Sequence, residues 1–290
     1  MRRLMRNYHI SESTILIMLA VTVGLSTGAG VLVFRTTFHG LEHFFFETLG
    51  QDGFIGHWLE AINLPPALAT ILILTAVGAL VGLIVQAFVG HEKYHGVAGI
   101  MESVALTGGR LPYMKQPAKA IASALSLGAG ASVGPEDPSV QIGASLGSFF
   151  GQYLGLSEER VVLLVGAGSA SAIAAAFNAP IAGVFFAIEV VLGRFETSAI
   201  SVIVLSAVIS SAITRAFIGA RPTFGQLNYV LGSPEQLVFF VLLGILLAGV
   251  AVIVIRLFFW TTEFWHTRLH LPLPIEVAVT GALVGTIGVF

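Results

Sequence analysis

Two acidic residues stand side by side in the segment GASVGPEDPSVQIGAS (residues 130–145), between Pro135 and Pro138. Asp137 followed by Pro138 is typical of a helix start, because Asp caps a first turn and Pro suits its first position. A helix N-terminus offers unpaired N–H groups and partial positive charge, so it can bind an anion or a carboxylate of its own chain. We expect Glu136 to occupy such a site when ionised and to leave it when protonated. The alternative is a loop in water, in which both acids only cap the helix.

The segment HEKYH (residues 91–95) is a second pattern that could do chemistry. It matches H-E-x-x-H, which on a helix places two imidazoles one turn apart for zinc, with Glu92 as general base, as in intramembrane metalloproteases. No third ligand follows at metzincin spacing, and Gly96 ends any helix at once. A solvated loop is the preferred interpretation, and an intramembrane zinc metallopeptidase is kept as the alternative of another class.

The composition indicates what kind of element must position these residues. Charged residues make up 10% of the 290 residues, whereas a soluble domain carries about 25%. Long apolar runs predict membrane-spanning helices rather than barrel strands, so we expect an integral, multi-pass, all-α membrane protein. The apolar segments are Thr14 to Phe34, Ala67 to Val89, Val161 to Leu192, Ala199 to Ile218, Glu235 to Phe259 and Ile275 to Phe290.

Basic residues predict the orientation in the membrane. Arg2, Arg3 and Arg6 precede the first apolar run, which is too long for a signal peptide and is expected to be an uncleaved span. The positive-inside rule then places the N-terminus in the cytoplasm. Residues 36–66 contain no Lys or Arg and are expected to form an outer loop, whereas residues 90–119 carry four and are expected inside.

The predicted outer loop holds His39, His43 and His57, which we expect at the surface. Its aromatic run HFFFE (residues 43–47) is expected to anchor the chain at the membrane interface. A net charge of -2 without a basic tract gives no nucleic-acid-binding surface, and the absence of Cys excludes disulfides and thiolate metal sites. The preferred interpretation therefore has no cofactor, no metal and no enzymatic activity.

After the second apolar run the segments become short and interrupted. Residues 95–109 hold too few apolar residues to cross a bilayer, residues 118–134 are helix-like until their glycines, and residues 138–155 restart at a proline. In AAAFNAPIAGVFFAIEVV, Asn178 and Pro180 are expected to stop one helix and start another. Interrupted helices of this kind point to a transporter binding site, because non-helical backbone at membrane depth must be buried or line a cavity.

Three segments resemble the CLC family of chloride channels and proton-coupled chloride antiporters. GASVGPEDPSVQIGASLG is similar to the family's G(R/K)EGP…IG, AAAFNAPIAGVFFAIEVV to AAFNAPLAGxxFxxEE, and GVAGIMES to the anion-binding turn GSGIPE. The resemblance implies a polytopic fold of tilted and broken helices in two inverted repeats, here truncated. It implies a cytoplasmic segment over 1–13, the first repeat over 14–219 and the start of the second over 220–290.

The resemblance also implies a function and a set of site residues. Glu136 matches the gating glutamate, which competes with the anion and exchanges protons with the outside. The implied anion-binding residues are Ala98, Gly99, Ile100, Asp137, Pro138, Ser139 and Val140. The implied activity is transport of small inorganic anions, chloride first, with protons as a further partner. It would take place in a homodimer of the plasma membrane with residues 180–218 near the interface.

Several positions depart from the family pattern. Ala98 replaces a hydroxyl residue, which removes a donor worth about 0.5–1.5 kcal/mol of anion binding. Pro135 and Asp137 replace the Arg and Gly that flank the gating glutamate, and Val190 replaces the inner proton-transfer acid, leaving Glu189 beside it. Proton coupling is therefore an open point. A passive anion channel, a fluoride exporter and an inactive assembly partner are the alternatives within this resemblance.

Overall fold

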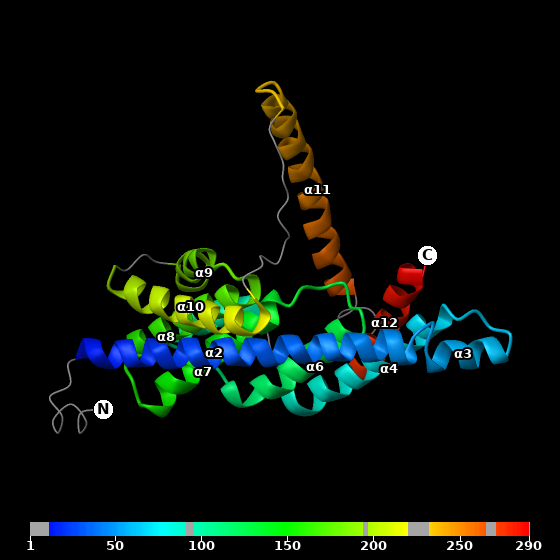
Figure 1. Cartoon of the computed structure of the whole chain (residues 1–290), viewed down its shortest axis with the longest axis horizontal. Helices are drawn as coiled ribbons and strands as arrows, with labels where there is room; N and C mark the ends of the chain where they lie inside the picture. Colours follow the sequence, from blue (N-terminus) through cyan, green and yellow to red (C-terminus); the bar gives the residue numbers. More distant parts are fainter. Residues whose placement is uncertain (1–11, 91–95, 194–196, 220–231, 265–270, 290) are drawn as a thin grey trace.

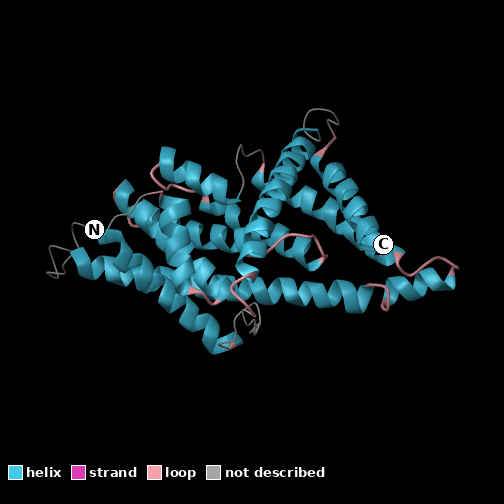
Figure 2. Cartoon of the chain, turned by 90° about the horizontal axis from the view of Figure 1, so that it is seen from above, coloured by secondary structure: helices cyan, strands magenta, loops and turns pink. Residues whose placement is uncertain are grey.

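The computed structural model describes residues 12–90, 96–193, 197–219, 232–264 and 271–289, and within these residues it holds helices and loops without a strand (Figure 2). Five stretches in the described part are long and apolar enough to cross a membrane, which confirms the all-α, multi-pass membrane fold. The α-helices are α2 (Glu12–His43), α3 (Phe54–Ala61), α4 (Leu68–Ile84), α5 (Gly96–Leu106), α6 (Gln116–Gly128), α7 (Glu136–Tyr153), α8 (Glu158–Phe177), α9 (Pro180–Phe186), α10 (Thr197–Ile218), α11 (Gln236–Phe264) and α12 (Leu273–Val289). Short π-helical segments η1 (Phe44–Leu49), η2 (Val85–Val89) and η4 (Ala187–Leu192) follow α2, α4 and α9, and the 3-10 turn η3 (Tyr113–Lys115) precedes α6.

The predicted helix breaks are confirmed. The short segment after the second span is α5, which has only 11 residues. Asn178 ends α8 in the left-handed conformation, with φ 58°, and α9 begins at Pro180. Proline fits this first turn because it has no N–H to leave unpaired there. The chain thus supplies several helix starts within the bundle.

The prediction that residues 36–66 form a loop is wrong, because these residues are largely helical. α2 continues to His43 and passes directly into η1, and α3 follows after a turn. Two pairs one turn apart accompany this extension, His39 with Glu42 at 3.0 Å and His43 with Glu47 at 2.8 Å. The prediction failed because α2 continues past the apolar run, where side-chain pairs at this spacing support the helix.

Close helix crossings hold α7 against α8. Gly143 of α7 and Gly168 of α8 meet so tightly that a Cβ atom on either one would collide with the backbone carbonyl of the other. Buried hydroxyls join α8 to α10, where Ser171 Oγ lies 2.7 Å from Ser206 Oγ and Ser210 Oγ donates to Ser171 O at 2.8 Å. Small residues and interhelical hydrogen bonds are the usual means of packing helices in lipid. The glycine crossing holds α7 on α8, and the hydroxyls hold α8 on α10.

The C-terminal helices pack differently from the rest. α11 stands away from the bundle (Figure 1) and buries none of its residues in the described structure. α12 instead crosses α4, where Gly78 approaches the backbone of Val277 and Gly281 approaches Leu74. Because α4 also contacts α6, α4 lies packed between α12 and α6.

Candidate functional site at the start of α7

The two acidic neighbours lie in the first turn of α7. The helix begins at Glu136, and its N-cap is Pro135, which makes no side-chain capping hydrogen bond. The expectation that Asp137 caps this helix is therefore wrong. Pro135 occupies the N-cap position, and the Asp137 carboxylate is directed to another helix. Ser139 is the first residue whose N–H bonds within the turn, at 3.2 Å to Pro135 O.

Asp137 connects the start of α7 to the start of α5. Its Oδ1 accepts the Val97 N–H at 2.8 Å, and its Oδ2 accepts Gln141 Nε2 at 2.7 Å. Gly96 makes this approach possible, since its φ of 65° favours glycine and a Cβ atom there would overlap the Asp137 carboxylate. The first amides of a helix have no partner within it, so Asp137 satisfies a donor that α5 cannot.

Glu136 faces a different space. Its carboxylate folds back over Gly134, where a Cβ atom would meet it. With residues of α2 it lines a cavity of about 500 Å³, which we call the α2 cavity. The charged and titratable residues in this lining are Arg35, His39, Glu42 and Glu136.

Two further cavities adjoin Asp137. The junction cavity, of about 390 Å³, is lined by Asp137, Lys119 and Gln141 among others. The basic cavity, of about 430 Å³, includes Arg110, Lys115 and Lys119 in its lining. Gly96, Lys119 and Gln141 line both cavities, so the two meet beside the start of α5.

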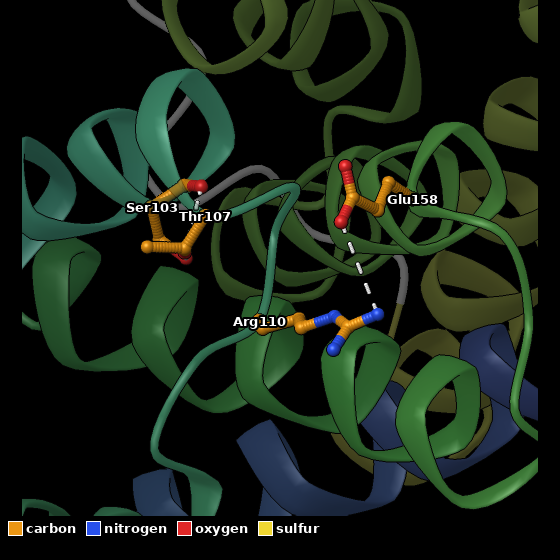
Figure 3. Close-up of polar contacts among 4 residues, drawn as sticks. All are labelled: Ser103, Thr107, Arg110 and Glu158. Atoms are coloured by element: carbon orange, nitrogen blue, oxygen red, sulfur yellow. Dashed lines mark hydrogen bonds and ion pairs between the residues drawn. The ribbon is translucent and has the colours of Figure 1, made fainter.

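Arg110 and Lys115 of the basic cavity each reach an oxygen atom of another element. Figure 3 shows Arg110 directed towards Glu158 at the start of α8, with Nη2 3.9 Å from Oε1. The pair is exposed, so solvent and salt weaken it. Lys115 Nζ donates to Val89 O at 2.7 Å. Ser103 and Thr107, whose hydroxyls are 2.8 Å apart, lie on the neighbouring part of the wall (Figure 3).

Residues 77–290 match the family model described as voltage gated chloride channel. The chain belongs to this CLC family. It is similar to chloride channel protein CLC-f of Arabidopsis thaliana, with 31% identity over 94% of this chain and 35% of the relative. It is also similar to the putative chloride channel protein ClcB-like of Ralstonia nicotianae, with 32% identity over 77% of this chain and 53% of the relative. Among solved structures, a slow cyanobacterial Cl⁻/H⁺ antiporter has 25% sequence identity and a TM-score of 0.79, covering 95% of this chain and 64% of that one.

The CLC chain therefore spans less than two thirds of the length of each of these proteins. The residues that its resemblance assigned to anion binding come from two helix starts, and the structure brings these starts together. Ala98, Gly99 and Ile100 lie near the start of α5, with the Ile100 side chain in the hydrophobic core. Pro138, Ser139 and Val140 are buried in the first turns of α7.

The weaker proton-pathway positions lie in η4, which packs against α5. Glu189 and Val190 are both exposed there, and Glu102 of α5 lines the basic cavity. The structure thus leaves Glu189 accessible and puts an uncharged side chain beside it.

Sequence reasoning missed several residues of the candidate site. Lys119 carried a signal, because a lysine within an apolar, helix-like run is costly in a membrane unless it has a role. Gln141 also carried one, because it lies four residues after Asp137 and so on the same helix face. Arg35 gave no signal, because the extension of α2 into the predicted loop was not foreseen. Val97 contributes only its backbone N–H to the contact with Asp137, and a side-chain type gives no sign of such a role.

The HEKYH segment lies outside the described residues, so its side chains are not placed. Within the described part of the chain, no three His, Cys, Asp or Glu side chains lie close enough to share a metal ion. The zinc interpretation therefore gains no support from the described residues.

Proposed function

We propose that this chain carries the gating region of a CLC-type transport protein that moves small anions, chloride first, across a membrane. The observation that carries the proposal is the 2.8 Å hydrogen bond from Val97 N–H to Asp137, which joins two helix starts beside the basic cavity. Partial positive charge at both helix starts, together with three cationic side chains, favours an anion there. The named activities of the relatives, a chloride channel and a Cl⁻/H⁺ antiporter, support the same substrate.

Glu136 is the gate in this proposal. Its carboxylate is tethered to the first turn of α7, so when ionised it competes with a mobile anion for the same positive helix end. Protonation removes that charge and lets the side chain leave. Flux is therefore expected to rise as the pH in the α2 cavity falls. Arg35, His39 and Glu42 are the other charged and titratable residues that line this cavity.

The basic cavity supplies anions to the site. Arg110, Lys115 and Lys119 raise the local anion concentration at its wall, an effect that salt screens over about 10 Å at 0.1 M. With the N-terminus in the cytoplasm, this cavity opens to the cytoplasmic side of the plasma membrane. A homodimer with residues 180–218 near its interface is part of the same proposal.

Anion movement is not obligatorily coupled to protons in this proposal. A coupled exchanger needs an ionisable relay across the inner half of the membrane, and Val190 can neither bind nor pass a proton. Glu189 is the adjacent residue of η4, so its side chain leaves the helix in another direction. A passive anion channel is therefore the second candidate function, and Val190 is the observation that favours it.

The test is the pH dependence of chloride efflux from proteoliposomes that contain either the unmodified protein or Glu136→Gln. The amide keeps the size of the side chain but cannot titrate. Loss of the pH dependence in the variant supports the gate, and an unchanged pH profile removes Glu136 from it.

A further inference from the structure

Glu136 and Asp137 line different cavities, although they are adjacent in sequence. Consecutive residues on a helix point about 100° apart. Glu136 lines the α2 cavity, and Asp137 lines the junction cavity. The proposed gate at Glu136 gives a role to the acid in the α2 cavity. It gives no role to Asp137 in the junction cavity.

The Asp137 carboxylate already has the contacts that a bound anion would have. It accepts a first-turn amide of α5 at 2.8 Å and a side-chain amide at 2.7 Å. The cation Lys119 lines the same cavity. Hydrogen bonds to a charged acceptor are about twice as strong as neutral ones, so a mobile anion must compete with this carboxylate for its donors.

Asp137 also stands where the junction cavity meets the basic cavity. Gly96 and Gln141 line both cavities, and both contact the Asp137 carboxylate. An anion that moves from one cavity to the other passes the groups that hold Asp137. The other charged side chains lining these two cavities are Lys119, Arg110, Lys115 and Glu102.

We propose that Asp137 is a second tethered carboxylate, which competes with the transported anion at the start of α5 and lowers its apparent affinity. The inference rests on the proposed anion transport and adds to it the residue that sets the working anion concentration. Passage requires the Asp137 side chain to release Val97 N–H. Glu136 and Asp137 then control two successive positions, one in each cavity.

The competing explanation is that Asp137 only clamps α5 to α7. A clamp and a competitor predict opposite changes in anion affinity. Removal of a competitor frees the amide and lowers the half-saturating chloride concentration. Removal of a clamp loosens the helix start, which raises that concentration or leaves it unchanged while the protein loses stability.

The experiment measures the half-saturating chloride concentration and the maximal rate of efflux from proteoliposomes for the unmodified protein, Asp137→Ala and Asp137→Asn. Asp137→Asn keeps an acceptor for Val97 N–H, so it retains the clamp if the alanine variant fails to fold. Glu60→Gln is the matched control, because it removes the same charge from an exposed position of α3. Thermal unfolding of each purified variant reports the structural contribution separately.

We expect the half-saturating concentration to fall about tenfold in Asp137→Ala and by a smaller factor in Asp137→Asn, with no change in Glu60→Gln. A value that stays constant or rises in Asp137→Asn overturns the competitor role while efflux by the unmodified protein still supports anion transport. Absence of chloride efflux from the unmodified protein overturns the proposed function and this inference with it.

Discussion

The carboxylates of Glu136 and Asp137 are adjacent along α7 but line separate cavities, one beside α2 and one beside α5. The Glu136 carboxylate packs over Gly134, and the Asp137 carboxylate accepts the Val97 N–H. The doublet therefore places one negative charge at each of two positions around one helix start.

For the gate, replacing Glu136 by Gln should abolish the pH dependence of anion flux, because the amide has the shape of the acid without its proton equilibrium. Efflux measured between acidic and neutral pH should be flat in the variant and should rise towards acidic pH in the unmodified protein. Glu60→Gln should keep the normal profile. A variant with the normal profile would assign the pH dependence to Glu42, His39 or another group of the α2 cavity.

For anion supply, Arg110→Gln should raise the half-saturating chloride concentration about two- to threefold at low ionic strength, since it removes one cation from the basic cavity. Glu158→Gln should shift it in the opposite direction, because it removes the acid that faces Arg110 at 3.9 Å. Both shifts should shrink in 1 M of an impermeant salt, where the screening length is about 3 Å. Equal shifts at both ionic strengths would indicate a structural effect instead.

For packing, Gly143→Ala should destabilise the protein by about 1–3 kcal/mol, because the new methyl group meets the backbone of Gly168. Gly40→Ala is the matched control. It lies inside α2 with open space around it, so the same methyl group should stabilise the helix by about 0.5–1 kcal/mol. Thermal unfolding in detergent micelles compares the two. Equal melting temperatures would show that the α7 and α8 crossing is looser than described.

Much of the fold follows from the sequence because its signals are local. Apolar length predicts the spans, and Asn178 with Pro180 predicts the break between α8 and α9. The extension of α2 beyond Arg35 could not be predicted, since residues 36–43 are neither apolar nor charged enough to distinguish a helix from a loop. Its continuation depends on pairs such as His39 with Glu42, which form only once the helix exists.

The candidate site could be predicted in part. Glu136 was found through its motif and its position at a helix start. The direction of Asp137 could not be predicted, because it depends on how α5 and α7 approach each other, a tertiary arrangement that no spacing within either segment encodes. The cavities need three or more separate elements and so appear only in the folded chain.

For the HEKYH segment, we expect no stoichiometric zinc in the purified protein, and we expect His91→Ala to leave anion flux unaltered. The reason lies in the sequence: no third ligand follows HEKYH at metzincin spacing, and a glycine follows the motif directly. Elemental analysis of the purified protein is the measurement. One zinc per chain, lost in His91→Ala, would overturn the loop interpretation.

For coupling, an outward chloride gradient alone should not drive stoichiometric proton uptake into vesicles, because Val190 provides no titratable relay. Val190→Glu should increase the uptake that accompanies a given chloride flux. Robust uptake by the unmodified protein would contradict the uncoupled interpretation. Loss of that uptake in Glu189→Gln would then place the relay one residue earlier.

Anion transport itself is tested most directly by chloride efflux from proteoliposomes reconstituted with the intact protein, recorded with and without a proton gradient against protein-free vesicles. We predict efflux well above that of protein-free vesicles, faster at acidic pH, and proceeding down the chloride gradient whether or not a proton gradient is present. Efflux no faster than that of protein-free vesicles under every condition would contradict the proposed anion transport.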